Sequence, residues 1–457
     1  MGHSELVEKP KYQNLLRSML ITKRFALFSA VMLVFIFFGL IALLIQLDQG
    51  LVVTGMRDRI FYGTYITNFV FWIGVSHAGM FITGILRVAN VEWRTPVTRM
   101  AESITIFALL IGVGNILVDM GRLDRILSVF YLGRISSPIV WDFLSISTYF
   151  SGSLLFLYLA LVPDLALLRD RAKEKGKTRY HFYKILAARW HGSPEQSRLL
   201  DRALNILPFI IIPVAVSVHT VVSWIFGMTW RPGWHSTIFG PYFLVGAIFS
   251  GIAAVIFAMA VFQKIYHLQD FLTEKHFQNL SKLLLIFALL YLYFTIAEYL
   301  TVGYTNWEEE AELLNILFYG EFAWMFWFFI IPGLLLPILI IVNPRTRTKN
   351  WIIFACLLIN VGMWLKRYFI VIPTLSLPVV GLDVASYLPT WVEITITIAG
   401  FALFIFLYAM FSKIFPIVSI WEMIEYDTKK EEMGANRVTD TPESMKENRK
   451  IKDKSLA

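Results

Sequence analysis

Ionisable side chains stand at the ends of long apolar runs in this sequence. One apolar run ends at Asp119, and another opens with Trp141 and Asp142. The short connection between them carries Arg122 and further arginines. A charged group inside a bilayer costs roughly 2.5–3.5 kcal/mol on insertion scales, so each of these residues needs a partner or a function. Carboxylates in such a position can exchange protons with a bound substrate.

Composition indicates that these residues belong to a membrane protein. The chain has 457 residues, of which 57% are hydrophobic and 16% are charged, and its mean hydropathy is +0.62. About 20 apolar residues are enough to cross a bilayer core. We therefore predict an all-α polytopic membrane protein with ten transmembrane spans. The predicted spans are 25–47, 65–88, 101–119, 141–163, 204–226, 241–263, 283–303, 318–342, 351–372 and 391–415.

Lysine and arginine are distributed unevenly between the loops. The termini, the loops on their side and the span ends next to them carry 33 of them, and the opposite loops carry 6. Because positively charged loops remain in the cytoplasm, both termini are predicted to be cytoplasmic. We expect a cytoplasmic segment 1–24, a transmembrane domain 25–426 with a basic cytoplasmic loop 164–203, and a charged, disordered tail 427–457. The net charge of +8 reflects this orientation, and no nucleic-acid partner is indicated.

With this orientation, nearly all ionisable residues of the spans fall in the extracytoplasmic half. The residues at the extracytoplasmic ends of the spans are Asp119, Asp142, Glu321 and Glu393. Somewhat deeper are His219, Glu298, Lys366 and Arg367, and His77 is near the centre of its span. Arg122 can pair with Asp119, three residues before it. Glu102 is the one comparable acid at a cytoplasmic end.

A quinone suits this combination of residues. Its ring and tail are apolar, its two oxygens need hydrogen-bond partners, and its redox chemistry moves protons together with electrons. A histidine and a carboxylate are suited to such proton transfer. Asp142 and His219 are therefore the candidates to bind the quinone or accept its protons, and Asp119 with Arg122 would tune the site. The supporting candidates are His77, Asn68 and Trp141.

Other redox groups find few ligands in this chain. The single cysteine, Cys356, and the absence of a C-x-x-C-H motif predict no intrinsic iron–sulfur cluster, no attached haem and no metal site. A bis-histidine haem needs two histidines at matching depth. Only His77 and His219 lie within spans, and we place them at different depths. The alternatives are helix packing for His77 and a helix–helix hydrogen bond for His219, with Ser223 one turn further on.

The second half of the chain carries a polar cluster of its own. The string IFALL occurs at 106–110 and 286–290, and a similar offset relates Asp119 and Asp142 to Glu298 and Glu321. The cluster consists of Glu298, Glu321, Lys366 and Arg367. Structural ion pairs of the two cations with Glu298 or Asp142 are an alternative interpretation. A parallel repeat with ionisable residues in the membrane also fits a transporter, which is the alternative from another functional class.

Seven segments in the same order resemble the NrfD/polysulfide-reductase membrane-subunit family, and above all the ten-span quinol-binding subunits of alternative complex III. The segments are GTYITNFVFWIGVSHAG (63–79), DMGR (119–122), WDFLSISTYF (141–150), VPD (162–164), SVHT (217–220), PGWHSTIFGPYF (232–243) and NVGMWLKR (360–367). Many members of the family carry a histidine where this chain has Asp119. Relatives of the alternative complex III type often have an acid where Lys366 stands.

The resemblance implies two four-helix bundles, spans 2–5 and 6–9, flanked by spans 1 and 10. It implies a quinone site near the extracytoplasmic face, with site residues at Asp119, Asp142 and His219. The expected substrate is menaquinone, and the expected partners are an extracytoplasmic, ferredoxin-like iron–sulfur subunit and other subunits of a respiratory complex in a prokaryotic cytoplasmic membrane. Proton translocation has been suggested for the family. The alternatives are a quinone-reducing or sulfur-respiration complex, and a structural anchor without a redox role.

Overall fold

The computed structural model describes residues 10–89, 91–174, 176, 179–377 and 386–428, and most of these residues are helical. Ten of the described helices are long and apolar enough to cross a membrane, which confirms the prediction of an all-α polytopic protein with ten spans. They are α3 (Lys23–Gln49), α4 (Thr64–Val88), α5 (Thr95–Asp119), α7 (Pro138–Glu174), α9 (Pro194–Gly227), α10 (Phe239–Tyr266), α11 (Glu274–Thr305), the interrupted helix α13–α14 (Ala323–Val342), α15 (Lys349–Ser376) and α16 (Trp391–Ile414). Most of the predicted disordered tail, from residue 429 on, lies outside the described residues.

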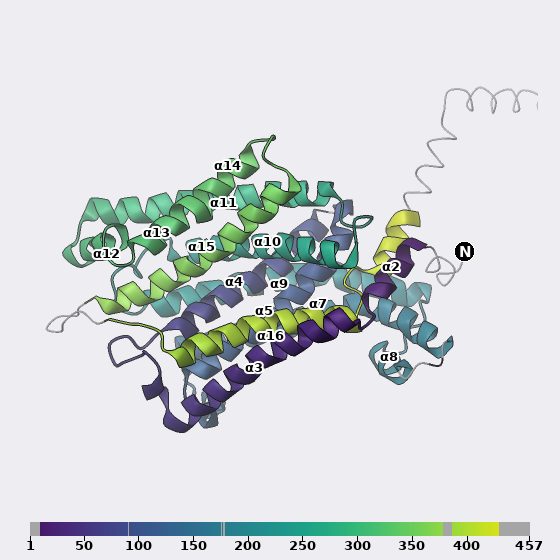
Figure 1. Cartoon of the computed structure of the whole chain (residues 1–457), viewed down its shortest axis with the longest axis horizontal. Helices are drawn as coiled ribbons and strands as arrows, with labels where there is room; N and C mark the ends of the chain where they lie inside the picture. The colour runs from purple at the N-terminus through teal and green to yellow at the C-terminus, as the bar shows by residue number, and fades with distance from the viewer. Residues whose placement is uncertain (1–9, 90, 175, 177–178, 378–385, 429–457) are drawn as a thin grey trace, which may run out of the picture.

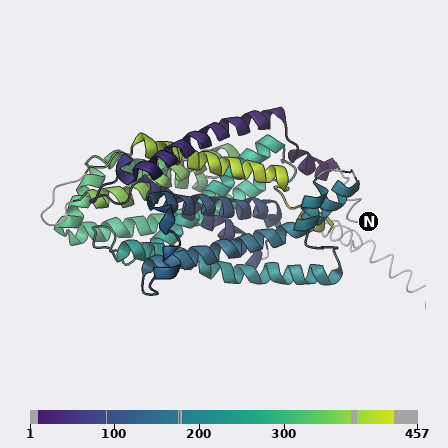
Figure 2. The ribbon, with the colours of Figure 1, turned by 90° about the horizontal axis from the view of Figure 1, so that it is seen from below.

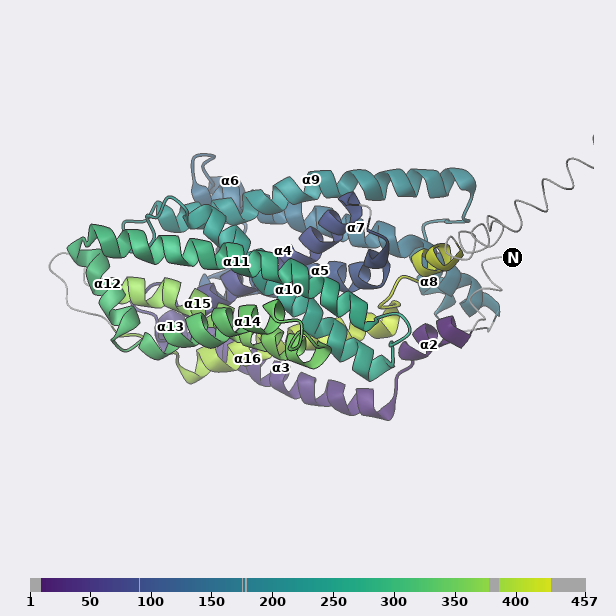
Figure 3. The same cartoon turned by 90° about the horizontal axis from the view of Figure 1, so that it is seen from above.

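The spans lie beside one another along the longest axis of the molecule (Figure 1). Helices α4, α5, α7 and α9 pack on one another, and we call them the first helix group. Helices α10, α11, α13, α14 and α15 form the second helix group, and α4 joins the two groups by packing on α10. Helices α3 and α16 pack together as a flanking pair, purple and yellow-green in Figure 2. Helix α9 lies along the opposite edge from α3 (Figure 3).

The shorter helices mark the two ends of the bundle. Helices α2 (Pro10–Ser18) and α8 (Tyr180–Leu186) lie at one end, and α12 (Glu308–Phe318) lies at the other (Figure 1). The connection between α5 and α7, with the short helix α6 (Ser128–Leu132), follows Asp119 directly. We call the end of the first helix group that holds Asp119 the Asp119 end, and the opposite end, where α5 begins, the Arg99 end.

Local sequence signals explain where several helices begin and end. Ser193 and Gln196 form a capping box at the start of α9, and Thr390 and Glu393 form one at the start of α16, so that free backbone amides are hydrogen-bonded. Helix α5 ends because Gly121, two residues after its last residue, has a φ of +63°. Glycine adopts this left-handed conformation without the steric cost that other residues meet.

The interrupted helix α13–α14 contains a π-helical segment, η4 (Ile331–Leu335). Pro332 lies within this segment and Pro337 follows it, and proline cannot donate the backbone hydrogen bond of a regular helix. The irregular turn brings Gly333 against α15. A methyl group added at Gly362 of α15 would lie 2.8 Å from the Cα of Gly333, so the two backbones approach too closely for any side chain.

The connection between α7 and α9 is shorter than predicted. We expected a loop over 164–203, but α7 continues to Glu174 and α9 begins at Pro194. The predicted span ended before Asp164 because a charged residue was taken to leave the membrane. The structure shows instead that Asp164 is buried within α7, so its charge is compensated inside the protein and the helix continues.

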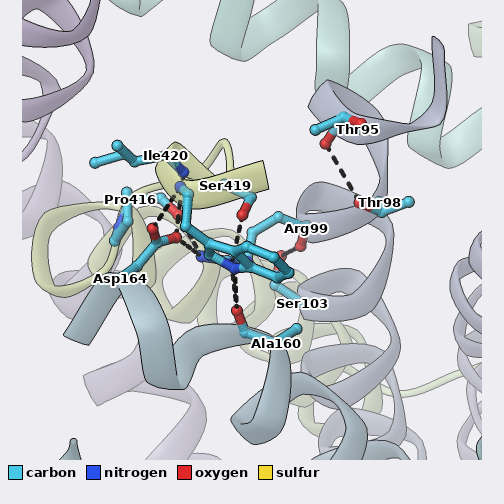
Figure 4. Close-up of polar contacts among 10 residues, drawn as sticks. Thr95, Thr98, Arg99, Ser103, Ala160, Asp164, Pro416, Ser419 and Ile420 are labelled. Carbon is cyan, nitrogen blue, oxygen red and sulfur yellow. Dashed lines mark hydrogen bonds and ion pairs between the residues drawn. The ribbon is translucent and has the colours of Figure 1, made fainter. Parts of the chain in front are cut away.

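The partner of Asp164 is Arg99 of α5 (Figure 4). The two side chains are 0% and 1% exposed, and Nη1 of Arg99 lies 2.9 Å from Oδ2 of Asp164. Nη2 of Arg99 also donates to the carbonyl oxygen of Ala160 at 2.7 Å. Asp164 accepts hydrogen bonds from the backbone amides of Ile420 and Trp421, at 3.2 and 2.9 Å. The ion pair therefore fastens the helix that begins at Ile420 to α5 and α7.

Replacing Asp164 with alanine is expected to lower the free energy of unfolding by roughly 3–5 kcal/mol, because Arg99 would be left buried without a counter-charge. Unfolding of the purified protein in detergent measures this loss. The control is Asp170→Ala on the same helix, which removes the largely exposed partner of Arg169. It should cost about 1 kcal/mol or less. Equal losses in the two variants would contradict the importance of the buried pair.

Candidate functional site

Two histidines from different helices meet inside the first helix group. Nδ1 of His219 on α9 lies 3.0 Å from Nε2 of His77 on α4, and both rings are buried. Nε2 of His77 also lies 2.8 Å from the carbonyl oxygen of Ala215, and its Nδ1 lies 2.6 Å from that of Ile73. We call these two side chains the histidine pair. Its ring nitrogens form a direct proton-exchange contact between α4 and α9.

Tyr149 of α7 holds the histidine pair from a third helix. Its ring stacks on that of His77, with centroids 4.7 Å apart and an angle of 26° between the planes. The Tyr149 hydroxyl donates to the carbonyl oxygen of Ser76 at 3.1 Å, and Thr105 of α5 donates to the same oxygen at 2.8 Å. All four helices of the first group therefore meet at this level.

The prediction that His77 and His219 lie at different depths is wrong, because the two rings are in contact. The argument against a bis-histidine haem can therefore no longer rest on a difference in depth. Both nitrogens of His77 face protein atoms, so in this arrangement the ring has no nitrogen directed at a separate iron. The helix–helix hydrogen bond considered for His219 is found, but its partner is His77. Ser223 donates to the carbonyl oxygen of Thr220 at 2.7 Å, and no bond between it and His219 is found among the described residues.

Asp142 lies one turn inside α7, where its side chain is 8% exposed. Its Oδ1 is buried and has no hydrogen-bond partner among the described residues. A methyl group at Gly152 of α7 would touch Ile211 of α9 at 3.5 Å, so these positions are level. The helices are antiparallel, so ten residues from Gly152 bring Asp142 level with position 221. That is two residues from His219, or ~3 Å along the axis at 1.5 Å per residue. Tyr149, which stacks on His77, lies seven residues or ~10 Å from Asp142 along α7, so Asp142 lies on the Asp119 side of the histidine pair.

Asp119, the third predicted site residue, faces the flanking pair of helices. It interacts electrostatically with Glu393 of α16 and with Tyr65 of α4. Its Oδ1 is buried and has no hydrogen-bond partner among the described residues. In the described part of the chain, no hydrogen bond or ion pair joins Asp119, Asp142 and His219 to one another. Asp142 lies on the Asp119 side of His219, and Asp119 lies at the end of α5, which packs on α16.

The predicted pairing of Arg122 with Asp119 is wrong. Nε and Nη2 of Arg122 donate to the two carboxylate oxygens of Asp124, at 2.9 and 2.8 Å. The expected i, i+3 geometry requires a continuous helix, but the left-handed Gly121 ends α5 before Arg122. The Arg122 guanidinium holds the pKa of Asp124 at about 2, and both side chains are largely exposed.

Glu393 ties together the loops around Asp119. The carboxylate of Glu393, which is fully buried, accepts hydrogen bonds from the backbone amides of Gly55 and Thr390, at 2.6 and 3.0 Å, and from the hydroxyl of Tyr387. Burial, together with the charge of Glu393, raises the pKa of Tyr387, so this hydroxyl stays a donor. Glu393 is therefore a buried structural link, and its side chain does not extend to the membrane surface.

The two remaining supporting residues lie apart from the histidine pair. Asn68 donates to Thr397 of α16 and accepts from Nε1 of Trp364 on α15, each at 2.9 Å. It therefore links α4 to α15 and α16. Trp141 is 51% exposed, and its Nε1 donates to the carbonyl oxygen of Ile135 at 2.7 Å. Its ring lies at the surface next to Asp142.

Only part of the polar cluster predicted for the second half of the chain comes together in the structure. Nζ of Lys366 donates to the Tyr299 hydroxyl at 2.8 Å and lies 4.8 Å from the ring centroid of Phe369. Lys366 also interacts electrostatically with Glu298, which is buried. Glu321 is exposed. Arg367, next to Lys366 on α15, interacts electrostatically with His219 and therefore adjoins the histidine pair.

A second group of buried charges, at the Arg99 end, was not predicted. Besides Arg99 and Asp164, it contains Glu102 with an unpaired Oε2, and Glu422, which pairs with Arg87 at 3.0 Å. We had singled out Glu102 alone. The available signal was the number of arginines and acids close to the ends of predicted spans, which we assigned to loops. The Tyr149 contact could not have been predicted, because stacking on His77 requires knowledge of helix packing.

These observations define a polytopic helical membrane protein whose interior holds proton-exchanging side chains. The chain belongs to the family described as polysulphide reductase, NrfD, whose family model matches residues 52–378. This confirms the resemblance at the level of the family. The closer likeness to alternative complex III stays a prediction.

Three relatives illustrate the family. The chain is 25% identical to a selenate reductase subunit of Mesobacillus selenatarsenatis, with 83% of this chain and 91% of that protein covered. It is 24% identical to the Hdr-like menaquinol oxidoreductase integral membrane subunit of Archaeoglobus fulgidus, covering 72% and 74%. It is also 24% identical to the menaquinone reductase integral membrane subunit of Nitratidesulfovibrio vulgaris, covering 81% and 86%. The likeness thus extends over most of each chain.

A double-mutant cycle tests the contact between the two histidines. We expect the variants His77→Ala, His219→Ala and their combination to give a coupling energy of roughly 0.5–3 kcal/mol in the free energy of unfolding. The reason is that each single change leaves the other ring with an unsatisfied buried nitrogen. The control is Ser217→Ala on α9, an exposed hydroxyl that should couple to His77 by less than about 0.5 kcal/mol. Additive effects of the two histidine changes would contradict the contact.

Proposed function

We propose that this chain is the quinone-binding membrane subunit of a multisubunit respiratory oxidoreductase in a prokaryotic cytoplasmic membrane. Membership of the NrfD family and the names of the relatives support this proposal. Two of the three relatives carry menaquinol or menaquinone in their names, so menaquinone is the quinone that we propose.

One observation carries the proposed site: a buried carboxylate oxygen of Asp142, on the Asp119 side of the histidine pair, has no partner among the described residues. An unsatisfied buried acceptor is costly unless a ligand or water completes it. A quinone head between α7 and α9 would meet Asp142 on α7 and His219 on α9, and both side chains can exchange protons. Asp119 lies nearby at the end of α5, where its charge would influence the site through the surrounding low dielectric.

Oxidation of one quinol breaks two O–H bonds and releases two protons and two electrons. In the proposed reaction, the carboxylate of Asp142 and a ring nitrogen of His219 accept the protons. The electrons pass to an iron–sulfur subunit docked at the Asp119 end, which is the predicted extracytoplasmic side. In a quinone-reducing or sulfur-respiration complex, the same groups would supply protons while electrons arrive from the partner.

The variants Asp142→Asn and His219→Ala test this function in the assembled complex. Each is expected to lower quinol-dependent turnover by about 100-fold or more, since general acid–base groups contribute factors of this size. The matched control is Asp170→Asn, which neutralises a largely exposed carboxylate on the same helix, at the opposite end of α7. It should keep wild-type turnover.

The composition of the purified complex separates loss of chemistry from loss of assembly. The proposal requires that both variants assemble with their partner proteins and lose turnover. Normal turnover in both variants would overturn it. In that case a requirement for the chain in assembly would favour the structural anchor, and substrate uptake by the chain in liposomes would favour the transporter.

A further inference from the structure

The side chain of Arg367 extends from α15 of the second helix group into the interior, and its guanidinium lies beside the first helix group. Its side chain is 4% exposed. A methyl group at Gly246 of α10 would lie 3.2 Å from Nη2 of Arg367, and one at Gly74 of α4 would lie 3.6 Å from the same atom. The guanidinium therefore occupies the space that two glycines leave where α4 meets α10. Gly74 and His77 are three residues apart, on the same face of α4.

Among the described residues, the charge of Arg367 has no carboxylate partner, because none of the ion pairs there includes it. Its Nη1 meets the sulfur of Met363 at 3.9 Å, a weak acceptor, and its Nε finds no hydrogen-bond partner in the described part of the chain. The nearby groups that interact with it electrostatically are His219, the Tyr291 hydroxyl and the neighbouring cation Lys366. A fixed positive charge in a low dielectric therefore acts directly on His219.

The surroundings of His77 favour a positive charge on its ring, whereas Arg367 opposes a positive charge on His219. Both ring nitrogens of His77 face backbone carbonyl oxygens, at 2.6 and 2.8 Å, and carbonyl oxygens only accept hydrogen bonds. A neutral ring has one N–H and can satisfy one of them, whereas a doubly protonated ring satisfies both. Three other groups adjoin the pair. The Ser76 hydroxyl lies 3.3 Å from Nδ1 of His77 and donates to the carbonyl oxygen of Ile73. The Tyr149 hydroxyl donates to the carbonyl oxygen of Ser76, as does Thr105, and neither serine nor threonine titrates at neutral pH.

We propose that Arg367 is a positioning residue that directs a proton received by the histidine pair onto His77 and away from His219. The charge of Arg367 opposes a second positive charge on His219, while the two carbonyl oxygens stabilise a charged His77. His219 is thereby returned to its neutral form, ready to accept another proton. The inference rests on the proposed function only in assigning quinol as the source of the proton.

The location of the proton is tested without turnover. We would record pH-dependent difference infrared spectra of the whole complex with labelled histidine side chains, and compare the wild type with His77→Gln and His219→Gln. The band of a buried doubly protonated ring should disappear in His77→Gln and remain in His219→Gln. The reverse result would overturn the proposal. Because this measurement requires no quinone, its result does not depend on whether the proposed function is correct.

The role of Arg367 is tested with Arg367→Gln and Arg367→Lys. In the glutamine variant, part of the charged-ring band should move to His219. The acidic limb of the pH–rate profile should also move to higher pH by about one unit or more, because a protonated His219 cannot accept a proton. The lysine variant keeps the charge and should restore the wild-type spectrum and profile. It also provides a folded comparison if the glutamine variant assembles poorly.

A charge-removing control is Arg345→Gln, an exposed arginine in the connection before α15. It should leave both the spectrum and the pH profile unchanged. A purely structural role for Arg367 would lower activity equally at every pH and leave the spectrum unchanged, and that result would overturn the inference.

Discussion

A polar side chain inside this bundle must find its partner within the protein, because the surrounding lipid offers none. Two interactions satisfy this constraint for the most buried groups. The ion pair of Arg99 with Asp164 joins α5, α7 and the helix that begins at Ile420. The contact of His77 with His219 joins α4 and α9, and Tyr149 adds α7 to it. The packing of the first helix group therefore depends on polar contacts as well as on apolar area.

The spans could be predicted from the sequence because length and apolar composition determine whether a helix can cross a bilayer. The ends of the spans could not. Asp164 looked like the start of a loop, since an isolated charge is expensive in the membrane. Arg99, 65 residues earlier in the chain, compensates the charge of Asp164, and α7 continues past Asp164 to Glu174. Which charges have partners depends on tertiary structure, and this is why the predicted loop was too long.

The candidate site, like the spans, could be predicted from the sequence only in part. Residue types singled out His77 and His219 as candidates, but counting from span ends placed the two at different depths. They are 142 residues apart in the chain and in contact in space. The choice of partner also depends on the backbone: Arg122 pairs with Asp124 because Gly121 has already ended the helix. Pairings within one helix can be predicted from spacing, whereas those across helices and turns require the packing.

Helix α15 shows how one element can serve two environments. Successive residues of an α-helix point about 100° apart, so the adjacent cations Lys366 and Arg367 face different neighbours. Lys366 lies among aromatic rings of the second helix group, where Tyr299 accepts its hydrogen bond. Arg367 reaches the first group through the gap at Gly246. A movement of α15 would change both environments together, so the second group can influence the histidine pair without contributing a residue that touches the substrate.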